Sequence, residues 1–137
     1  MDTLPFHLRL PATLDSVTQL LDALEAHIEA AGISPGIAAR LALVAEEVTA
    51  NVAMHAVGAT YFEMRVTPGE GQLDVCIEDD GPEYDPLARA VPDTSAALED
   101  RDVGGLGVHL VRELTRDARY QRRAGLNRLV CTLPLVG

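Results

Sequence analysis

Apolar residues recur along this chain at two spacings, every second position and every third or fourth position, which are typical of strands and helices respectively. Turn-forming residues such as Pro11 and Gly32 separate the apolar segments. The predicted elements are a strand at 3–10, helices at 13–31 and about 35–56, strands at 60–67 and 72–79, a helix at about 106–116, and strands near 118–123 and 127–133. The pattern predicts an α+β fold, an open antiparallel sheet with helices on one face.

Individual apolar positions indicate which faces are buried. The first strand turns alternate residues inward, namely Leu4, Phe6, Leu8 and Leu10. The first helix carries an apolar stripe, namely Leu14, Val17, Leu21, Leu24 and Ile28. The second helix opens after Ser34 and Pro35, and the strands at 60–67 and 72–79 form a hairpin around the turn Pro68–Gly71. Residues 81–105 hold three prolines and no lasting apolar period, which indicates a long loop.

A polar stripe interrupts the second helix. Glu47, Asn51 and His55 recur every four residues and therefore share one helical face. Apolar residues lie on both sides of this stripe, Leu41, Val44, Val48 and Val52 on one and Leu43, Ala50 and Met54 on the other. Burying a carboxylate and an amide there costs several kcal/mol unless something bonds to them. The stripe predicts either a site for a hydrated magnesium ion and a proton acceptor or a seam of internal hydrogen bonds. For His55 a structural role is favoured.

Length and composition narrow the function classes. The 137 residues, 47% of them hydrophobic, predict one domain spanning 1–137. A formal charge of -10 argues against direct binding of nucleic acid, and the absence of lysine excludes a Walker A lysine and a Schiff base. No apolar run reaches the roughly 20 residues that cross a bilayer, so we expect a cytoplasmic protein with no membrane contact. Cys76 and Cys131 are expected to be buried free thiols.

Two further segments carry candidate chemistry. In LDVCIEDDGPEYDP, strand alternation places Asp79 at the end of a core-facing row, where its carboxylate could accept a hydrogen bond from a purine amino group or simply close the turn into Gly81. In DVGGLGVHLVREL, glycines lead into a helix, which offers backbone amides to phosphate oxygens or forms a plain turn. This second segment is not the dinucleotide fingerprint, because no βαβ unit surrounds it.

Taken in order, the three segments resemble the N, G1 and G2 boxes of the Bergerat-fold ATP-binding superfamily, which includes gyrase, heat-shock chaperones and histidine kinases. The closer resemblance is to the anti-sigma-factor serine kinases, the small single-domain branch. It rests on EEVTANVAMHA, DDGPEYDP and GGLGVHLVRELTRDARYQRRAGLNRLVCTLPL and spans residues 40–55, 73–86 and 104–133. The resemblance implies a two-layer sandwich, a mixed and mainly antiparallel sheet of about five strands covered on one face by about three helices.

The resemblance also implies residue roles, with ATP or ADP and Mg²⁺ as ligands. Glu47 would accept the proton of a partner serine, Asn51 would bind magnesium, and Asp79 would contact adenine. The remaining implied nucleotide-binding residues are Gly81, Arg101, Gly105, Leu106 and Gly107. The implied lid over the phosphates runs from Asp85 to Gly104.

Two features of this sequence depart from the family pattern. Glu83 stands where the usual DxGxG has its second glycine, and Val103 and Gly104 stand where relatives carry an arginine, so that Arg101 would have to reach the phosphates instead. Two hypotheses follow. The first is an ATP-dependent kinase, a homodimer, that phosphorylates a serine of a STAS-type antagonist and sequesters a sigma factor or similar regulator. The second is a non-catalytic partner-switch module that acts through complex formation only.

Overall fold

The computed structural model describes residues 5–83 and 111–135. Its elements are β1 (Phe6–Pro11), α1 (Leu14–Ala31), α2 (Pro35–His55), β2 (Tyr61–Gly69), β3 (Gln72–Asp79), β4 (Arg116–Arg123) and β5 (Leu126–Pro134). A helical turn at 111–114 precedes β4. It is the described part of the helix predicted at 106–116, and it ends at residue 114 because β4 begins at Arg116. Leu4 and most of the predicted loop at 81–105 lie outside the described residues.

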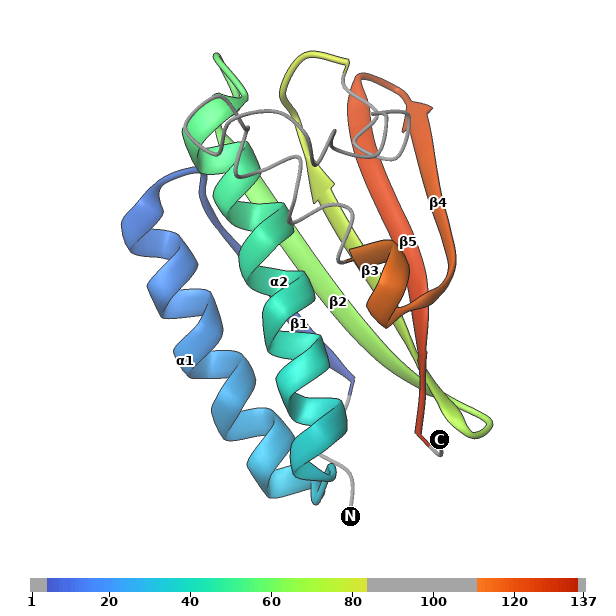
Figure 1. Cartoon of the computed structure of the whole chain (residues 1–137). Coiled ribbons are helices and arrows are strands. Elements are labelled where there is room, and N and C mark those ends of the chain that lie inside the picture. Colours follow the sequence, from blue (N-terminus) through green and yellow to red (C-terminus); the bar gives the residue numbers. More distant parts are fainter. Residues whose placement is uncertain (1–4, 84–110, 136–137) are drawn as a thin grey trace, which may run out of the picture.

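The elements form two layers. The sheet has the order β1-β2-β3-β5-β4, with every neighbouring pair antiparallel. Figure 1 shows α1 and α2 side by side over one face of this sheet, with β3 at its centre and β4 at one edge. The predicted α+β architecture is confirmed.

Alternate residues of the central strands make the core. In β3 the side chains of Leu73, Val75 and Ile77 are buried, and in β5 every second residue from Asn127 to Leu133 is buried. Each large aliphatic side chain removed from water in this way contributes about 1.5–3 kcal/mol. The alternation fixes the register, because a slip by one residue would turn the whole row toward solvent.

The buried face of α1 differs from the predicted stripe. Leu14 is 57% exposed and Leu21 is half-buried, whereas Leu20, which the prediction omitted, is fully buried. At about 100° per residue, Val17, Leu20, Leu24 and Ile28 centre on one direction, and Leu14 lies about 75° away from it. The prediction is confirmed for Val17, Leu24 and Ile28 and wrong for Leu14 and Leu21, because several apolar stripes fit this leucine-rich helix and only contact with α2 and the sheet selects one.

Helix α1 is capped at both ends. The Thr13 side chain accepts a hydrogen bond from the Ser16 amide (3.2 Å), and Gly32 closes the helix in the left-handed region at φ 72°. Helix α2 begins with Pro35 after Ser34, as predicted, but the Ser34 side chain makes no capping bond.

The hairpin turns are tighter than predicted. Pro68 and Gly69 still pair with β3, so the β2–β3 connection is two residues long and Gly71 takes the left-handed conformation at φ 71°. Between β4 and β5, Ala124 and Gly125 both have positive φ, 54° and 81°. Such paired left-handed residues match the twist of two-residue hairpins.

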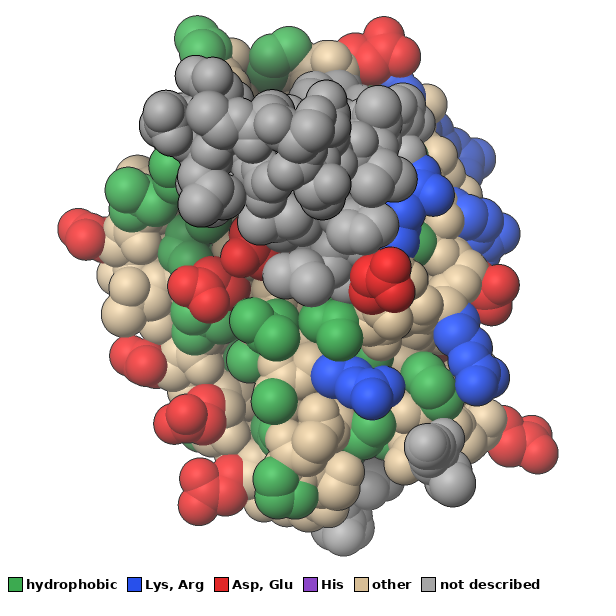
Figure 2. Space-filling model, viewed as in Figure 1, with side chains coloured by type: hydrophobic (Ala, Val, Ile, Leu, Met, Phe, Trp, Pro, Cys, Tyr) green, Lys and Arg blue, Asp and Glu red, His purple; other side chains and the backbone are tan. Residues whose placement is uncertain are grey.

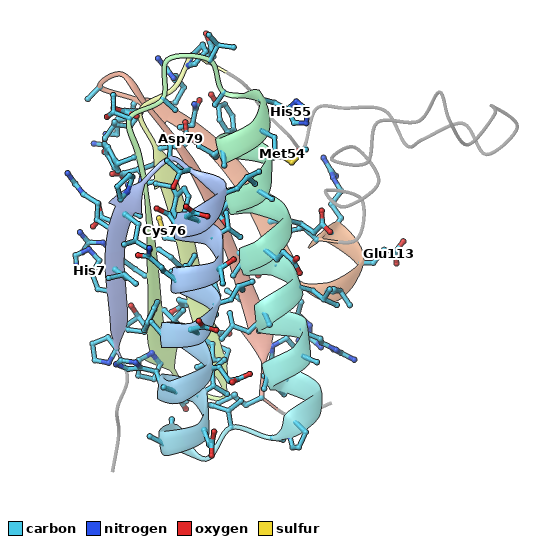
Figure 3. All side chains as sticks on the ribbon, turned by 90° about the vertical axis from the view of Figure 1, so that its left-hand side faces the viewer. His7, Met54, His55, Cys76, Asp79 and Glu113 are labelled. Carbon is cyan, nitrogen blue, oxygen red and sulfur yellow. The ribbon has the colours of Figure 1, made fainter. Side chains whose placement is uncertain are left out.

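Ion pairs cover the sheet face opposite the helices. The Glu63 side chain is 3% exposed and bonds His7, Arg9 (2.8 and 3.0 Å) and Arg65 (3.1 Å). Burial alone would raise the pKa of Glu63, but the hydrogen bonds from His7 and Arg9 lower it overall. The Arg9 guanidinium also lies 4.1 Å above the Tyr61 ring. Figure 3 shows His7 projecting from the sheet on the side away from α2.

Both cysteines are free, but only one matches its prediction. Cys131 is buried in the core, and burial raises the pKa of its thiol to about 11. Cys76 lies on the face with the ion pairs and is half-buried, with its sulfur 3.5 Å from Nη2 of Arg128. The prediction of burial for Cys76 was wrong because the helices cover only one face of β3.

Charges separate across the molecule. The acidic side chains of α1 are Asp15, Asp22, Glu25 and Glu29, whereas β4 carries four arginines. Figure 2 shows acidic groups gathered over α1 and basic groups over β4. Arginines on an edge strand also oppose pairing with another chain.

Candidate functional site

The polar stripe of α2 lies at the border between core and surface. On one side Val44, Val48 and Val52 are buried against the sheet, as predicted. On the other side Leu43 and Met54 are 41% and 57% exposed, so this flank faces outward rather than into the core. Glu47 and Asn51 are therefore half-buried, with one apolar flank packed and one open.

Within residues 5–83 and 111–135, the side chains of Glu47 and Asn51 make no hydrogen bond or ion pair with one another or with any other residue. Desolvation raises the pKa of Glu47, and the charge of Glu46 adds to this rise. In the described part of the chain, the seam of internal hydrogen bonds that the sequence left open is not formed. The arrangement offers a carboxylate and an amide, one turn apart, to a ligand.

His55 occupies the last position of α2 and is exposed. Figure 3 shows His55 and Met54 at the same end of the molecule as Asp79, which ends β3. The end of α2 and the end of β3 thus bring the first two candidate segments together.

Asp79 ends the core-facing row of β3 and is 9% exposed. Its Oδ1 accepts hydrogen bonds from the Gly81 amide (2.8 Å) and from Nδ2 of Asn127 (3.0 Å). Its Oδ2 makes no hydrogen bond within the described ranges. One oxygen closes the turn into Gly81, as one interpretation of the sequence proposed, while the other remains an acceptor for a ligand.

Gly81 allows the turn to approach α2 closely. A Cβ atom at this position would lie 3.0 Å from Oδ1 of Asp79, 3.1 Å from the Ala56 Cβ and 3.2 Å from the Ala59 Cβ. Because glycine has no side chain, the turn after β3 can pack closely against the residues that follow α2.

The neighbouring carboxylate has a structural role. Asp80 accepts hydrogen bonds from the amides of Thr60 (2.7 Å) and Tyr61 (3.2 Å) and from the Thr60 hydroxyl. Burial would raise the pKa of Asp80, but these bonds together hold it below its ordinary value. The consecutive aspartates thus point to opposite faces, and Asp80 ties β3 to the start of β2.

A polar group that sequence reasoning missed completes the surroundings of Asp79. Asn127 sits on β5 opposite Asp79, and its Oδ1 accepts from the Tyr120 hydroxyl (2.6 Å) and from Nη1 of Arg122 (3.1 Å). Arg122 Nη1 also donates to the Gly81 carbonyl (2.9 Å). The signal in the sequence is Asn127 itself, a polar residue at the head of the otherwise apolar alternating row of β5.

Several predicted site residues lie outside the described ranges, namely Arg101, Gly105, Leu106 and Gly107. Glu83, the residue that replaces the expected glycine, is exposed at the end of the first described range.

In the described residues no group of three His, Cys, Asp or Glu side chains could hold a metal ion. The donor set at α2 is instead one amide oxygen beside one carboxylate, which suits a Mg²⁺ ion that keeps several waters and phosphate ligands. None of the helices in the described part of the chain is long and apolar enough to span a bilayer.

Comparison with known proteins identifies the family of the chain. The family model for histidine kinase-like ATPase domains matches residues 10–133. The chain belongs to this family.

Among curated proteins, the chain is similar to the serine/threonine-protein kinase BtrW of Bordetella bronchiseptica, with 34% identity over 97 residues that cover 67% of each chain. Among solved structures it resembles that of the RsbU and RsbW domains of a Mycobacterium tuberculosis protein, with a TM-score of 0.67 and 18% identity. That match covers 96% of this chain and 32% of the other, so it shows the fold alone. The resemblance drawn from the sequence is confirmed.

Proposed function

We propose that this chain is an ATP-dependent protein serine kinase of the anti-sigma type. It transfers the γ-phosphate of ATP to a serine of a STAS-type antagonist and, in its other state, sequesters a sigma factor or similar regulator. We propose that it works as a cytoplasmic homodimer, without binding nucleic acid or membrane directly. The observation that carries this proposal is Glu47, a half-buried carboxylate without a partner in the described residues and with a raised pKa.

In this proposal Glu47 accepts the proton of the serine hydroxyl as the serine oxygen bonds to the γ-phosphorus. The bond from that phosphorus to the bridging oxygen breaks, and ADP leaves. A raised pKa makes a carboxylate a stronger base, which favours this transfer. Phosphoryl transfer otherwise depends on positioning and on neutralising charge.

Asn51 would hold a magnesium ion through its amide oxygen, and the ion would supply charge neutralisation at the phosphates. Asp79 would accept the adenine amino group at Oδ2. Gly81 lets the turn after β3 pack closely against Ala56 and Ala59, which helps to hold Asp79 in position. Arg101, Gly105, Leu106 and Gly107 remain the proposed phosphate-loop residues on the strength of the family resemblance.

The first test is calorimetric titration with ADP, with and without magnesium. Magnesium-dependent binding supports the proposal, and Asn51→Ala should remove the magnesium dependence. If the folded protein binds no ADP, the kinase proposal fails.

The second test follows phosphate transfer to a STAS-domain protein. Glu47→Gln should bind ADP normally but transfer no phosphate, because the amide cannot accept the serine proton. Glu25→Gln is the control, since Glu25 is an exposed glutamate on α1 and its charge does not contribute to the raised pKa of Glu47. Transfer that survives in Glu47→Gln would remove Glu47 from the mechanism.

The second candidate function is a partner-switch module without catalysis, favoured by Glu83. An acidic side chain just beyond the turn at Gly81 would repel nucleotide phosphates. Under this alternative the protein binds its regulator partner equally well with and without ADP. Glu83→Gly should then strengthen ADP binding.

A further inference from the structure

The orientation of the Asn127 amide is determined by its surroundings. The guanidinium of Arg122 can only donate, and its Nη1 lies 3.1 Å from Oδ1 of Asn127. The amide nitrogen must therefore face the other way, where Nδ2 donates to Asp79 Oδ1 (3.0 Å) and to the Pro82 carbonyl (2.9 Å). Arg122 on the edge strand thus favours the same orientation of the amide as the acceptors at Asp79 and Pro82.

This orientation restricts the hydrogen bonds that Asp79 can make with a ligand. Its Oδ1 receives two bonds, from Asn127 Nδ2 and from the Gly81 amide, and both groups are donors only. Oδ1 is therefore an acceptor in both bonds, and the carboxylate cannot rotate without losing both. Its Oδ2, without a hydrogen bond in the described ranges, is then the oxygen that meets a ligand.

We propose that Asn127 and Arg122 are positioning residues that set the preference of this site for a 6-amino purine over a 6-oxo purine. This inference rests on the proposed nucleotide-binding function. An adenine amino group donates to Oδ2, whereas the 6-oxo group of hypoxanthine or guanine brings a second acceptor against it. A buried acceptor left without its donor weakens binding by roughly tenfold or more.

Without the Asn127 donor, only the Gly81 amide holds Oδ1, so the Asp79 carboxylate is less restrained and can turn Oδ2 away from a 6-oxo group. Discrimination between the two bases should then decline even where binding persists. Loss of a residue with a merely structural role would weaken the binding of both nucleotides to the same extent. The ratio of the two affinities therefore separates positioning from general destabilisation.

The experiment measures the dissociation constants of ADP and inosine diphosphate by calorimetry for the full chain. We expect the unmodified protein to prefer ADP by about tenfold or more. Asn127→Leu should bring the ratio close to one, and Arg122→Met, on the exposed edge strand, should reduce it about threefold because the donor to Asn127 Oδ1 is lost while Asn127 itself remains. Arg122→Lys, which keeps a donor, should restore most of the preference.

Arg123→Met is the matched control, because it removes the same charge from the next position of β4, where the side chain is exposed and, within the described strands, makes no hydrogen bond to Asn127. It should leave both constants unchanged. If Asn127→Leu does not fold, Arg122→Met alone decides. An unchanged ratio in a variant that still binds ADP overturns the positioning role only. An unmodified protein that binds neither nucleotide overturns the proposed function itself.

Discussion

Replacing Gly81 by alanine adds a methyl group that would lie too close to three neighbouring atoms. The new Cβ would lie 3.0 Å from Oδ1 of Asp79 and 3.1 and 3.2 Å from the Cβ atoms of Ala56 and Ala59. Two of these neighbours are attached directly to the backbone, so they cannot swing away. The turn must move by a few tenths of an ångström.

This movement has two energetic consequences. Overpacking of a well-packed contact costs about 1–3 kcal/mol, and stretching the 2.8 Å hydrogen bond from the Gly81 amide to Asp79 forfeits part of about 0.5–1.5 kcal/mol. We therefore expect Gly81→Ala to lower the free energy of unfolding by about 2 kcal/mol. Because Asp79 moves with the turn, ADP affinity should fall as well.

Urea unfolding followed by circular dichroism measures the first effect, and calorimetry measures the second. Gly36→Ala is the control, because Gly36 lies in the first turn of α2 with nothing within 4 Å of its added Cβ. Alanine there should stabilise the protein by up to about 1 kcal/mol. A Gly81→Ala protein that is as stable as the unmodified one and binds ADP equally well would refute the close packing of this turn.

Three further predictions concern stability and thiol chemistry. Thr13→Ala should lower the free energy of unfolding by about 1 kcal/mol because it removes the α1 cap, whereas Ser34→Ala, which removes no capping bond, should change it little in the same urea assay. The folded pKa of Glu63 lies below its ordinary value of 4.5, so its stabilising contribution is present above about pH 4.5 and is lost as the pH falls through the folded pKa. Unfolding midpoints measured from pH 7 down to about pH 3 should therefore fall less steeply for Glu63→Gln, and identical slopes would contradict this role. A thiol reagent at about pH 8 should modify half-buried Cys76 in the native protein but reach Cys131 only after unfolding, since burial keeps the Cys131 thiol protonated. Rapid labelling of a native Cys76→Ser variant would contradict the burial of Cys131.

The sequence predicts most of the fold because alternation in the central strands is strong. The row from Leu73 to Asp79 is a clear period of two, and it correctly places Asp79 on the core side. Pro35 in the first turn of α2 and Gly32 at the C-cap of α1 are equally local signals. Local patterns of this kind do not depend on which strands become neighbours.

The residues that escaped prediction depend on tertiary pairing. Asn127 meets Asp79 across 48 positions of sequence, and only the register of β3 against β5 brings them opposite each other. The buried face of α1 is likewise chosen by its neighbours, as Leu14 and Leu20 show. Cys76 was misjudged because an apolar run alone does not reveal that one side of the sheet lacks helices.

The strand order places the parts that surround Asp79 at different depths in the sheet. Asp79 ends β3, which is hydrogen-bonded on both sides, by β2 and by β5. Arg122 belongs to β4, which in the described part of the sheet pairs only with β5. Backbone amides of a central strand exchange with solvent only through large openings, while those of an edge strand exchange through local fraying. Transient release of β4 would therefore withdraw the Arg122 support while β3 keeps its structure. Asp79 on the central strand thus keeps its position for as long as the core stays folded. The support that Arg122 gives to its orientation lasts only while the edge strand β4 stays paired.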